Sequence, residues 1–256
     1  MFDLAVCAEM VFTDLPLADR IRQIHELGFA VEIWSFADKD LDALAATGAR
    51  FSSMTGYLRG DLFDPEGADE VVRTAREALT AAAVLGVPRL VVHPGQLIDG
   101  HAARPQHRTT GAMWLAAQRG LAALGELGAA NDVMFCLENL NTIVDHPGVP
   151  MARAQDTLAL VESVGHPNVK MMLDLYHAQI GEGNLIELVR RAGSAIGEIQ
   201  VADVPGRCEP GTGEINYRAV ARALSDSGFG GPVGLEAYAA GDSVAALEAF
   251  RSAFTW

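Results

Sequence analysis

Short apolar runs rich in branched side chains alternate along the chain with longer stretches rich in alanine and leucine. Runs of the first kind are typical of buried strands, and stretches of the second kind are typical of helices. The pattern predicts strands over Leu4–Met10, Ala30–Ser35, Ala49–Gly56, Arg89–Gly95, Val133–Asn141, Val169–His177, Ile196–Asp203 and Pro232–Tyr238. It predicts a helix after each strand, over Leu15–Gly28, Leu41–Thr47, Pro65–Gly86, Thr110–Ala129, Ala154–Gly165, Leu185–Ala192, Tyr217–Gly228 and Ser243–Phe254.

The alternating order of strands and helices indicates a parallel sheet, because each helix carries the chain back to the start of the next strand. Eight such units is the number that closes the sheet into a (β/α)₈ TIM barrel, while an open, doubly wound sheet is the alternative. HELGFA, AAVLGVP and LSDSGFGGP each place a glycine where a predicted helix ends, as a left-handed cap requires. We therefore expect an α/β protein whose residues 1–256 form one TIM-barrel domain.

Alternate residues of the last four predicted strands form two different sets. One set is uniformly apolar, as in Val133, Phe135 and Leu137, and suits the face that packs against helices. Because neighbouring side chains of a strand point to opposite faces, the other set must point into the barrel. In each strand it ends in a polar side chain near the carboxyl end, where barrel enzymes have their sites. These side chains are Glu138, Asp174, Gln200 and Glu236.

Three carboxylates at one rim would repel one another strongly in a partly dry space. The lysine on these strands, Lys170, lies near the barrel floor, where we expect it to pair with Glu198. A divalent cation among the four polar ends is then the economical solution, and an all-oxygen set of ligands favours Mg²⁺ or Mn²⁺. The alternative is that some of these carboxylates form salt bridges with arginines from loops.

Charge and composition narrow the classes of function. The formal net charge of −14, from 33 acidic and 19 basic residues, repels phosphate backbones and speaks against a nucleic-acid partner. No apolar stretch reaches the roughly 18 residues expected of a membrane span. Cys7, Cys136 and Cys208 show no metal-finger spacing, and the acidic N-terminal segment is unlike a secretory signal, so we expect a cytoplasmic protein.

LENLN, LDLYHAQIGEGNL, EIQVADVPGRCEPGTGEINY and GLEAY resemble the hydroxypyruvate isomerase family of xylose isomerase-like TIM barrels. The likeness covers nearly the whole chain and is strongest from Val133 onward. It implies a divalent metal held at the same four positions that strand parity selects. It also implies that His177 and Arg207 lie near the substrate. Related ketose epimerases usually have histidine at the third position, so Gln200 favours the hydroxypyruvate or 2-oxo-tetronate isomerase branch.

Together these observations favour isomerisation of a short sugar acid between its α-hydroxy ketone and α-hydroxy aldehyde forms. The reaction moves one proton between adjacent carbons through an enediolate, whose charge a metal stabilises. Glu138 and Glu236 end the fifth and eighth predicted strands, nearly opposite each other, and we expect them to remove and return the proton. His93 ends the fourth strand, where it contacts the substrate or is a satisfied core histidine.

Three further functions remain open at this point. One is a ketose 3-epimerase or an inosose isomerase or dehydratase on the same scaffold. Another is a phosphodiesterase of the apurinic-endonuclease kind, which should need more histidine ligands and a basic face. The third is a non-catalytic barrel that serves as a binding subunit. The expected partner is a small anionic sugar acid or a ketose, with neither nucleic acid nor membrane; the number of chains that assemble, a homo-oligomer included, is open.

Overall fold

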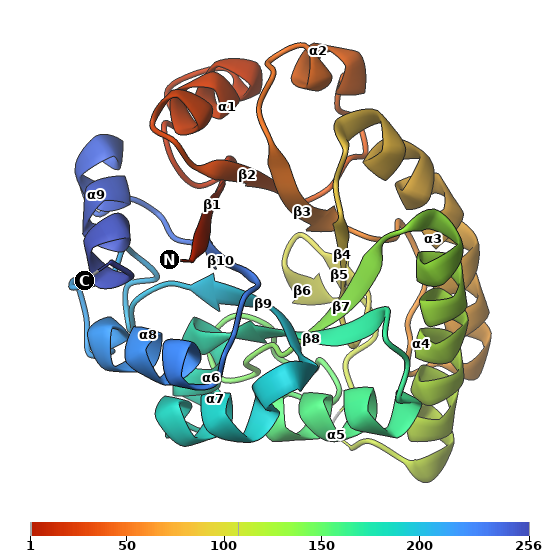
Figure 1. Ribbon diagram of the computed structural model, residues 1–256. Coiled ribbons are helices and arrows are strands. Elements are labelled where there is room, and N and C mark those ends of the chain that lie inside the picture. The colour runs from red at the N-terminus through yellow and green to blue at the C-terminus, as the bar shows by residue number, and fades with distance from the viewer. Residues whose placement is uncertain (1, 107, 256) are drawn as a thin grey trace.

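The computed structural model describes residues 2–106 and 108–255. Eight parallel strands form a closed barrel in the order β1-β10-β9-β8-β7-β4-β3-β2, and helices surround it (Figure 1). The predicted TIM barrel is thus confirmed over the open sheet, since β1 pairs with both β2 and β10. The strands are β1 (Asp3–Cys7), β2 (Ala30–Ile33), β3 (Phe51–Thr55), β4 (Arg89–Val92), β7 (Met134–Glu138), β8 (Val169–Asp174), β9 (Ile196–Val201) and β10 (Pro232–Leu235).

Helices follow the barrel strands where the sequence predicts them. Gly28, Gly86 and Gly228 have φ angles of 86°, 67° and 74°, so the three predicted glycines do lie at helix ends in the left-handed region. None of the helices in the described ranges is long and apolar enough to cross a membrane. The helices are α1 (Leu17–Glu26), α2 (Leu41–Ala45), α3 (Pro65–Leu85), α4 (Gly111–Asn131), α5 (Ala154–Val164), α7 (Leu185–Ala192), α8 (Tyr217–Asp226) and α9 (Ser243–Ala253).

The buried apolar side chains divide as the parity of the strands predicts. Phe135 and Leu137 belong to the large cluster that also contains the buried faces of the helices. Cys136 and Met172, from the other face, belong to a small separate cluster with Val91. The barrel therefore has an apolar layer outside the sheet and a thin apolar plug inside it, below the polar strand ends.

The predicted strands run past the observed ones at their carboxyl ends, and two elements that were not predicted lie there. The predicted strand over Val169–His177 is too long, because β8 ends at Asp174 and a short helix, α6 (Leu175–Gly181), begins there. The carboxylate of Asp174 caps this helix by accepting a 2.7 Å hydrogen bond from the backbone N–H of His177. The segment after β4 also forms a small antiparallel hairpin, β5 (Leu97–Ile98) with β6 (His101–Ala102).

Candidate active site at the barrel rim

The four polar side chains selected from strand parity lie together at the carboxyl end of the barrel. Strand register places Asp174 beside Gln200, and Gln200 beside Gly234, two residues before Glu236. The side chains of Glu138, Asp174 and Gln200 are buried, whereas that of Glu236 retains 16% exposure. Their position inside the barrel is as expected, and their use as metal ligands stays a prediction.

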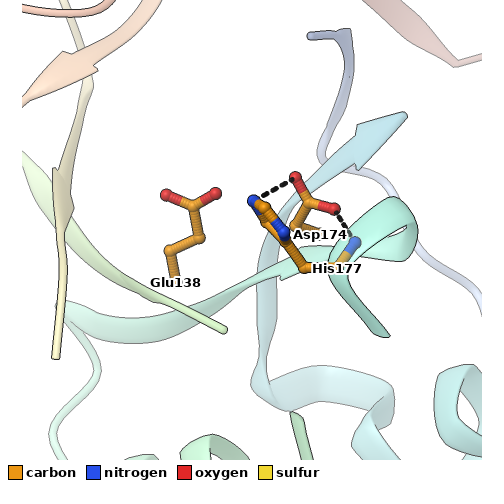
Figure 2. A group of neighbouring side chains, drawn as sticks. All are labelled: Glu138, Asp174 and His177. Carbon is orange, nitrogen blue, oxygen red and sulfur yellow. Dashed lines mark hydrogen bonds and ion pairs between the residues drawn. The ribbon is translucent and has the colours of Figure 1, made fainter. Parts of the chain in front are cut away.

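Glu138, Asp174 and His177 form the tightest group of potential ligands in the described part of the chain (Figure 2). Each offers one atom, and these atoms all lie within 4.8 Å of one another. The Nε2 atom of His177 is 3.9 Å from Oδ2 of Asp174, too far for a hydrogen bond. The group could therefore hold a metal ion, and it contains His177 beside two of the predicted ligands.

The electrostatics of the site leave an excess of negative charge. Burial and neighbouring carboxylates raise the pKa values of Glu138 and Asp174 well above their ordinary range. Burial lowers the pKa of His93 to about 4 and that of His177 well below its ordinary value, so both rings are neutral at pH 7. Arg207 is the cation that faces these carboxylates. The carboxyl groups of Glu138, Asp174 and Glu236 thus share one nearby guanidinium, and a bound divalent cation would stabilise the ionised forms that burial disfavours.

Gln200 supplies an independent reason to expect a cation. Its Nε2 donates a 3.0 Å hydrogen bond to Oε2 of Glu32, so the amide oxygen points elsewhere. This Oε1 atom is buried and has no partner among the described residues. A buried polar atom without a partner costs about 1–3 kcal/mol. A bound cation would offset this cost, and an amide oxygen is a ligand that Mg²⁺ and Mn²⁺ accept.

Glu236 differs from the other carboxylates because two donors already hold it. Its Oε2 accepts a 2.7 Å hydrogen bond from Arg207, and its Oε1 accepts one of 2.6 Å from the indole of Trp34. The guanidinium also lies 3.6 Å from Asp145 and over the ring of Tyr176. The alternative of an arginine salt bridge therefore describes Glu236. Each of its oxygens keeps a second lone pair, so the carboxylate could still reach a cation.

His93 contacts a glutamate, a contact that the sequence did not predict. Its Nε2 lies 3.3 Å from Oε2 of Glu138, and its Nδ1 lies 3.1 Å from the hydroxyl of Tyr57. If the phenol donates to Nδ1, the neutral ring carries its proton on Nε2 and donates it to the carboxylate. His93 is then placed to orient Glu138, and the predicted contact with substrate stays a prediction.

The floor of the site also differs from expectation. Lys170 donates to the backbone oxygen of Ser194 at 2.8 Å, so its predicted pairing with Glu198 is wrong. Glu198 is fully buried and lies beside Glu32 on the opposite wall of the barrel. A Cβ at Gly234 would lie 2.1 Å from Oε1 of Glu32, so the glycine leaves room for the carboxyl group in its observed position.

Sequence reasoning missed several residues that shape the site. Tyr57 follows β3 and contacts His93 after the neighbouring strand β4, 36 residues away in the sequence, so no local pattern announces this contact. Asn141 and Asp145 follow β7 directly and contact His177 and Arg207. Both are polar residues that follow a buried strand at the carboxyl end of the barrel, and this position could have marked them as site residues.

Comparison with known proteins places this architecture in a family. Residues 18–255 match the family profile described as Xylose isomerase-like TIM barrel. The chain belongs to this family. The match runs through all four polar strand ends, so the site of this xylose isomerase-like barrel lies within the matched region.

Named relatives of this barrel fall among the isomerases. A human protein named "Putative hydroxypyruvate isomerase" is 34% identical over 188 residues, which are 73% of this chain and 64% of that protein. A 2-oxo-tetronate isomerase of Cupriavidus necator is 35% identical over 200 residues, 77% of this chain and 74% of that protein. Among solved structures, the "AP endonuclease, family 2" of Brucella melitensis superposes with a TM-score of 0.86 at 26% identity, covering 98% of this chain and 99% of that one.

Proposed function

We propose that the protein is a divalent-metal-dependent isomerase of a short sugar acid, of the hydroxypyruvate/tartronate semialdehyde or 2-oxo-tetronate type. The observation that carries the proposal is the group of carboxyl side chains Glu138, Asp174 and Glu236 beside Arg207, in which burial and neighbouring carboxylates disfavour the ionised forms of Glu138 and Asp174 that a bound cation would stabilise. The names of the relatives support the same class of substrate. The acidic composition and the few histidines at the rim favour this function over phosphodiester cleavage.

The residues that would hold the cation are Glu138, Asp174, Gln200 and Glu236. Their oxygen atoms favour Mg²⁺ or Mn²⁺, and the unpartnered amide oxygen of Gln200 supports a place for that residue in the set. When bound, such a cation polarises the substrate carbonyl and stabilises the negative charge that develops on its oxygens.

The two glutamates are placed to move the proton. Glu138 ends β7 and Glu236 follows β10, with β8 and β9 between them in the barrel. One carboxylate removes a proton from the hydroxyl-bearing carbon, and the other returns a proton to the neighbouring carbon. Burial and neighbouring carboxylates raise the pKa of Glu138, so its carboxyl group holds a proton more readily than an exposed glutamate does, as suits a proton carrier.

Arg207 is the side chain that we assign to the acidic end of the substrate. Its Nε atom is buried without an acceptor among the described residues, while its terminal nitrogens contact Glu236 and Asp145. A guanidinium with an unused donor suits a carboxylate, which it can bind through two parallel hydrogen bonds. His177 lies beside it, and its unpartnered Nε2 could contact a substrate oxygen.

Proton exchange followed by NMR tests this function. Purified protein loaded with Mg²⁺ or Mn²⁺ is mixed with hydroxypyruvate, or with a panel of short 2-keto acids and ketoses, in D₂O. We expect deuterium to enter the carbon next to the carbonyl of a short hydroxy acid, and the exchange to stop with EDTA or in Glu138→Gln. Exchange confined to ketoses would make the protein an epimerase, and no exchange with any compound would leave a non-catalytic barrel.

A further inference from the structure

The side-chain amide of Asn141 has only one orientation compatible with its neighbours. The residue is fully buried just after β7. Its Oδ1 accepts hydrogen bonds from the backbone N–H groups of Val144 at 2.9 Å and Asp145 at 3.2 Å. Its Nδ2 lies 2.6 Å from Oδ2 of Asp145 and 2.7 Å from Nδ1 of His177. A flipped amide would turn its NH₂ group toward two donors and its oxygen toward a carboxylate.

The orientation of this amide determines where the proton of His177 resides. Because Nδ2 of Asn141 is a donor, Nδ1 of the ring must accept, and a neutral imidazole then carries its proton on Nε2. The ring is 1% exposed, and an Nδ1 atom that accepts a hydrogen bond carries no proton, so the contact with Asn141 requires the neutral form. Asp145 lies 3.9 Å from Nδ1, too far to compete with the amide.

We propose that Asn141 is a positioning residue that fixes His177 in its Nε2–H tautomer and thereby keeps this ring out of the metal's coordination sphere. A nitrogen that carries a proton has no lone pair for a cation. The tight group of Glu138, Asp174 and His177 then contains two ligands and one hydrogen-bond donor (Figure 2).

The donor has no partner within the described protein, because Nε2 is buried and unbonded. It is therefore free for an oxygen of the substrate, where a donor stabilises developing negative charge. This part of the inference rests on the proposed function. The coordination sphere keeps only oxygen ligands, which preserves the preference for hard ions over Co²⁺ or Zn²⁺.

The tautomer can be measured directly in the unaltered protein. Protein labelled with ¹⁵N in its histidine rings gives separate ring-nitrogen shifts for each tautomer, and His177→Gln identifies the resonances of residue 177. We expect the Nε2–H pattern in the metal-free protein and the same pattern after Mg²⁺ is added. An Nδ1–H pattern, a doubly protonated ring at pH 7, or a shift of Nε2 that marks direct coordination would overturn the proposal.

A matched pair of variants tests the role of Asn141. Asp145→Asn keeps the amide at position 141, and we expect it to keep the Nε2–H tautomer. Asn141→Asp combined with Asp145→Asn exchanges the two groups and keeps the native net charge, so that a carboxylate now accepts from Nδ1–H. The freed Nε2 lone pair should then raise the affinity for Co²⁺ relative to Mg²⁺ at least about tenfold over the native protein. An unchanged tautomer and an unchanged ratio in the exchanged variant would refute the role.

The outcomes separate this inference from the proposed function. The tautomer is measured without metal or substrate. An Nε2–H ring in a protein that exchanges no substrate proton would therefore refute the function and support the role of Asn141. Deuterium exchange into hydroxypyruvate by a protein with an Nδ1–H ring would support the function and refute the role of Asn141.

Discussion

Glu138 and Glu236 approach the same space from β7 and from the end of β10, but their neighbours differ in charge. Glu138 is buried, contacts the neutral ring of His93 and has a pKa raised well above its ordinary range by burial and by Glu236. Glu236 is held by the guanidinium of Arg207 and the indole N–H of Trp34. Among the described residues, Glu138 thus lacks a hydrogen-bonded cation, whereas Glu236 has one in Arg207.

This difference assigns separate tasks to two residues of the same type. A carboxyl group whose ionised form is disfavoured by burial holds a proton more readily than an exposed one, as suits an acid/base residue. A carboxylate fixed by two donors is oriented before substrate arrives, so it needs little reorganisation. We therefore expect Glu138 to depend on its burial and Glu236 to depend on its partners.

The largest effects should come from Glu138→Gln and Glu236→Gln. Each removes one of the two proton carriers, so turnover should fall at least about 10³-fold in both. Their stabilities should differ in direction, because Glu138→Gln removes a group whose ionised form is disfavoured by burial, whereas Glu236→Gln removes the carboxylate that accepts the 2.7 Å hydrogen bond from Arg207. Thermal unfolding of the metal-free variants measures this, and equal stabilities, or normal turnover in either variant, would contradict the assignment.

Arg207→Met should cause the next largest change. Loss of the guanidinium leaves Glu236 and Asp145 without their cation in a largely buried site, which should cost about 3 kcal/mol of unfolding free energy. Denaturant unfolding of the metal-free protein measures the loss, with Arg207→Lys as a control that keeps the charge but not the forked geometry. A methionine variant as stable as the native protein would show that the pairing of Glu236 carries little weight.

The comparison also shows how far the sequence alone could go. Strand parity brought Glu138, Asp174 and Gln200 into the barrel correctly, because alternation along a strand is a local property. It could not show that Arg207 reaches Glu236, or that Trp34, which follows β2, does so from two strands away. Those contacts join residues 29 and 202 positions apart in the sequence.

The ends of the strands were predicted less well than the strands themselves. The strand pattern runs past Asp174 because Leu175 and Tyr176 are apolar, but the carboxylate of Asp174 caps a helix there instead. A capping side chain and a metal-binding side chain look alike in a sequence. Asp174 is placed both to cap α6 and to bind a metal, and only the fold shows the capping.

A pH series sharpens the contrast on the Glu138 side. The pKa of His93 is lowered by burial from 6.5 to about 4 in the folded protein, so between these values the unfolded chain binds more protons. The contribution of this ring to stability is complete above about pH 6.5 and is lost as the pH falls toward 4. In the metal-free protein, His93→Gln should remove on the order of 2 kcal/mol of this pH dependence. Parallel curves of unfolding free energy against pH for the native protein and His93→Gln between pH 4 and 6.5 would contradict this prediction.

Trp34→Phe should give the smallest effect. It removes one donor from Glu236 while Arg207 remains, so the loss should be about 1 kcal/mol, or roughly fivefold in kcat/KM. The indole is 42% exposed, and stability should therefore change little. Steady-state kinetics and a melting curve measure the effects on activity and on stability separately. A loss of activity as large as that of Glu236→Gln would mean that the indole does more than orient the carboxylate.

The central claim is that the ends of β7 to β10 enclose one divalent cation. Calorimetric titration of the metal-free protein with Mn²⁺ tests it most directly, with Asp174→Asn as the comparison because its amide oxygen can still cap α6. The account predicts one ion per chain in the native protein, displaced by excess Mg²⁺, and an affinity lower by at least about tenfold in the variant. No binding to the native protein, or equal binding to both proteins, would contradict it.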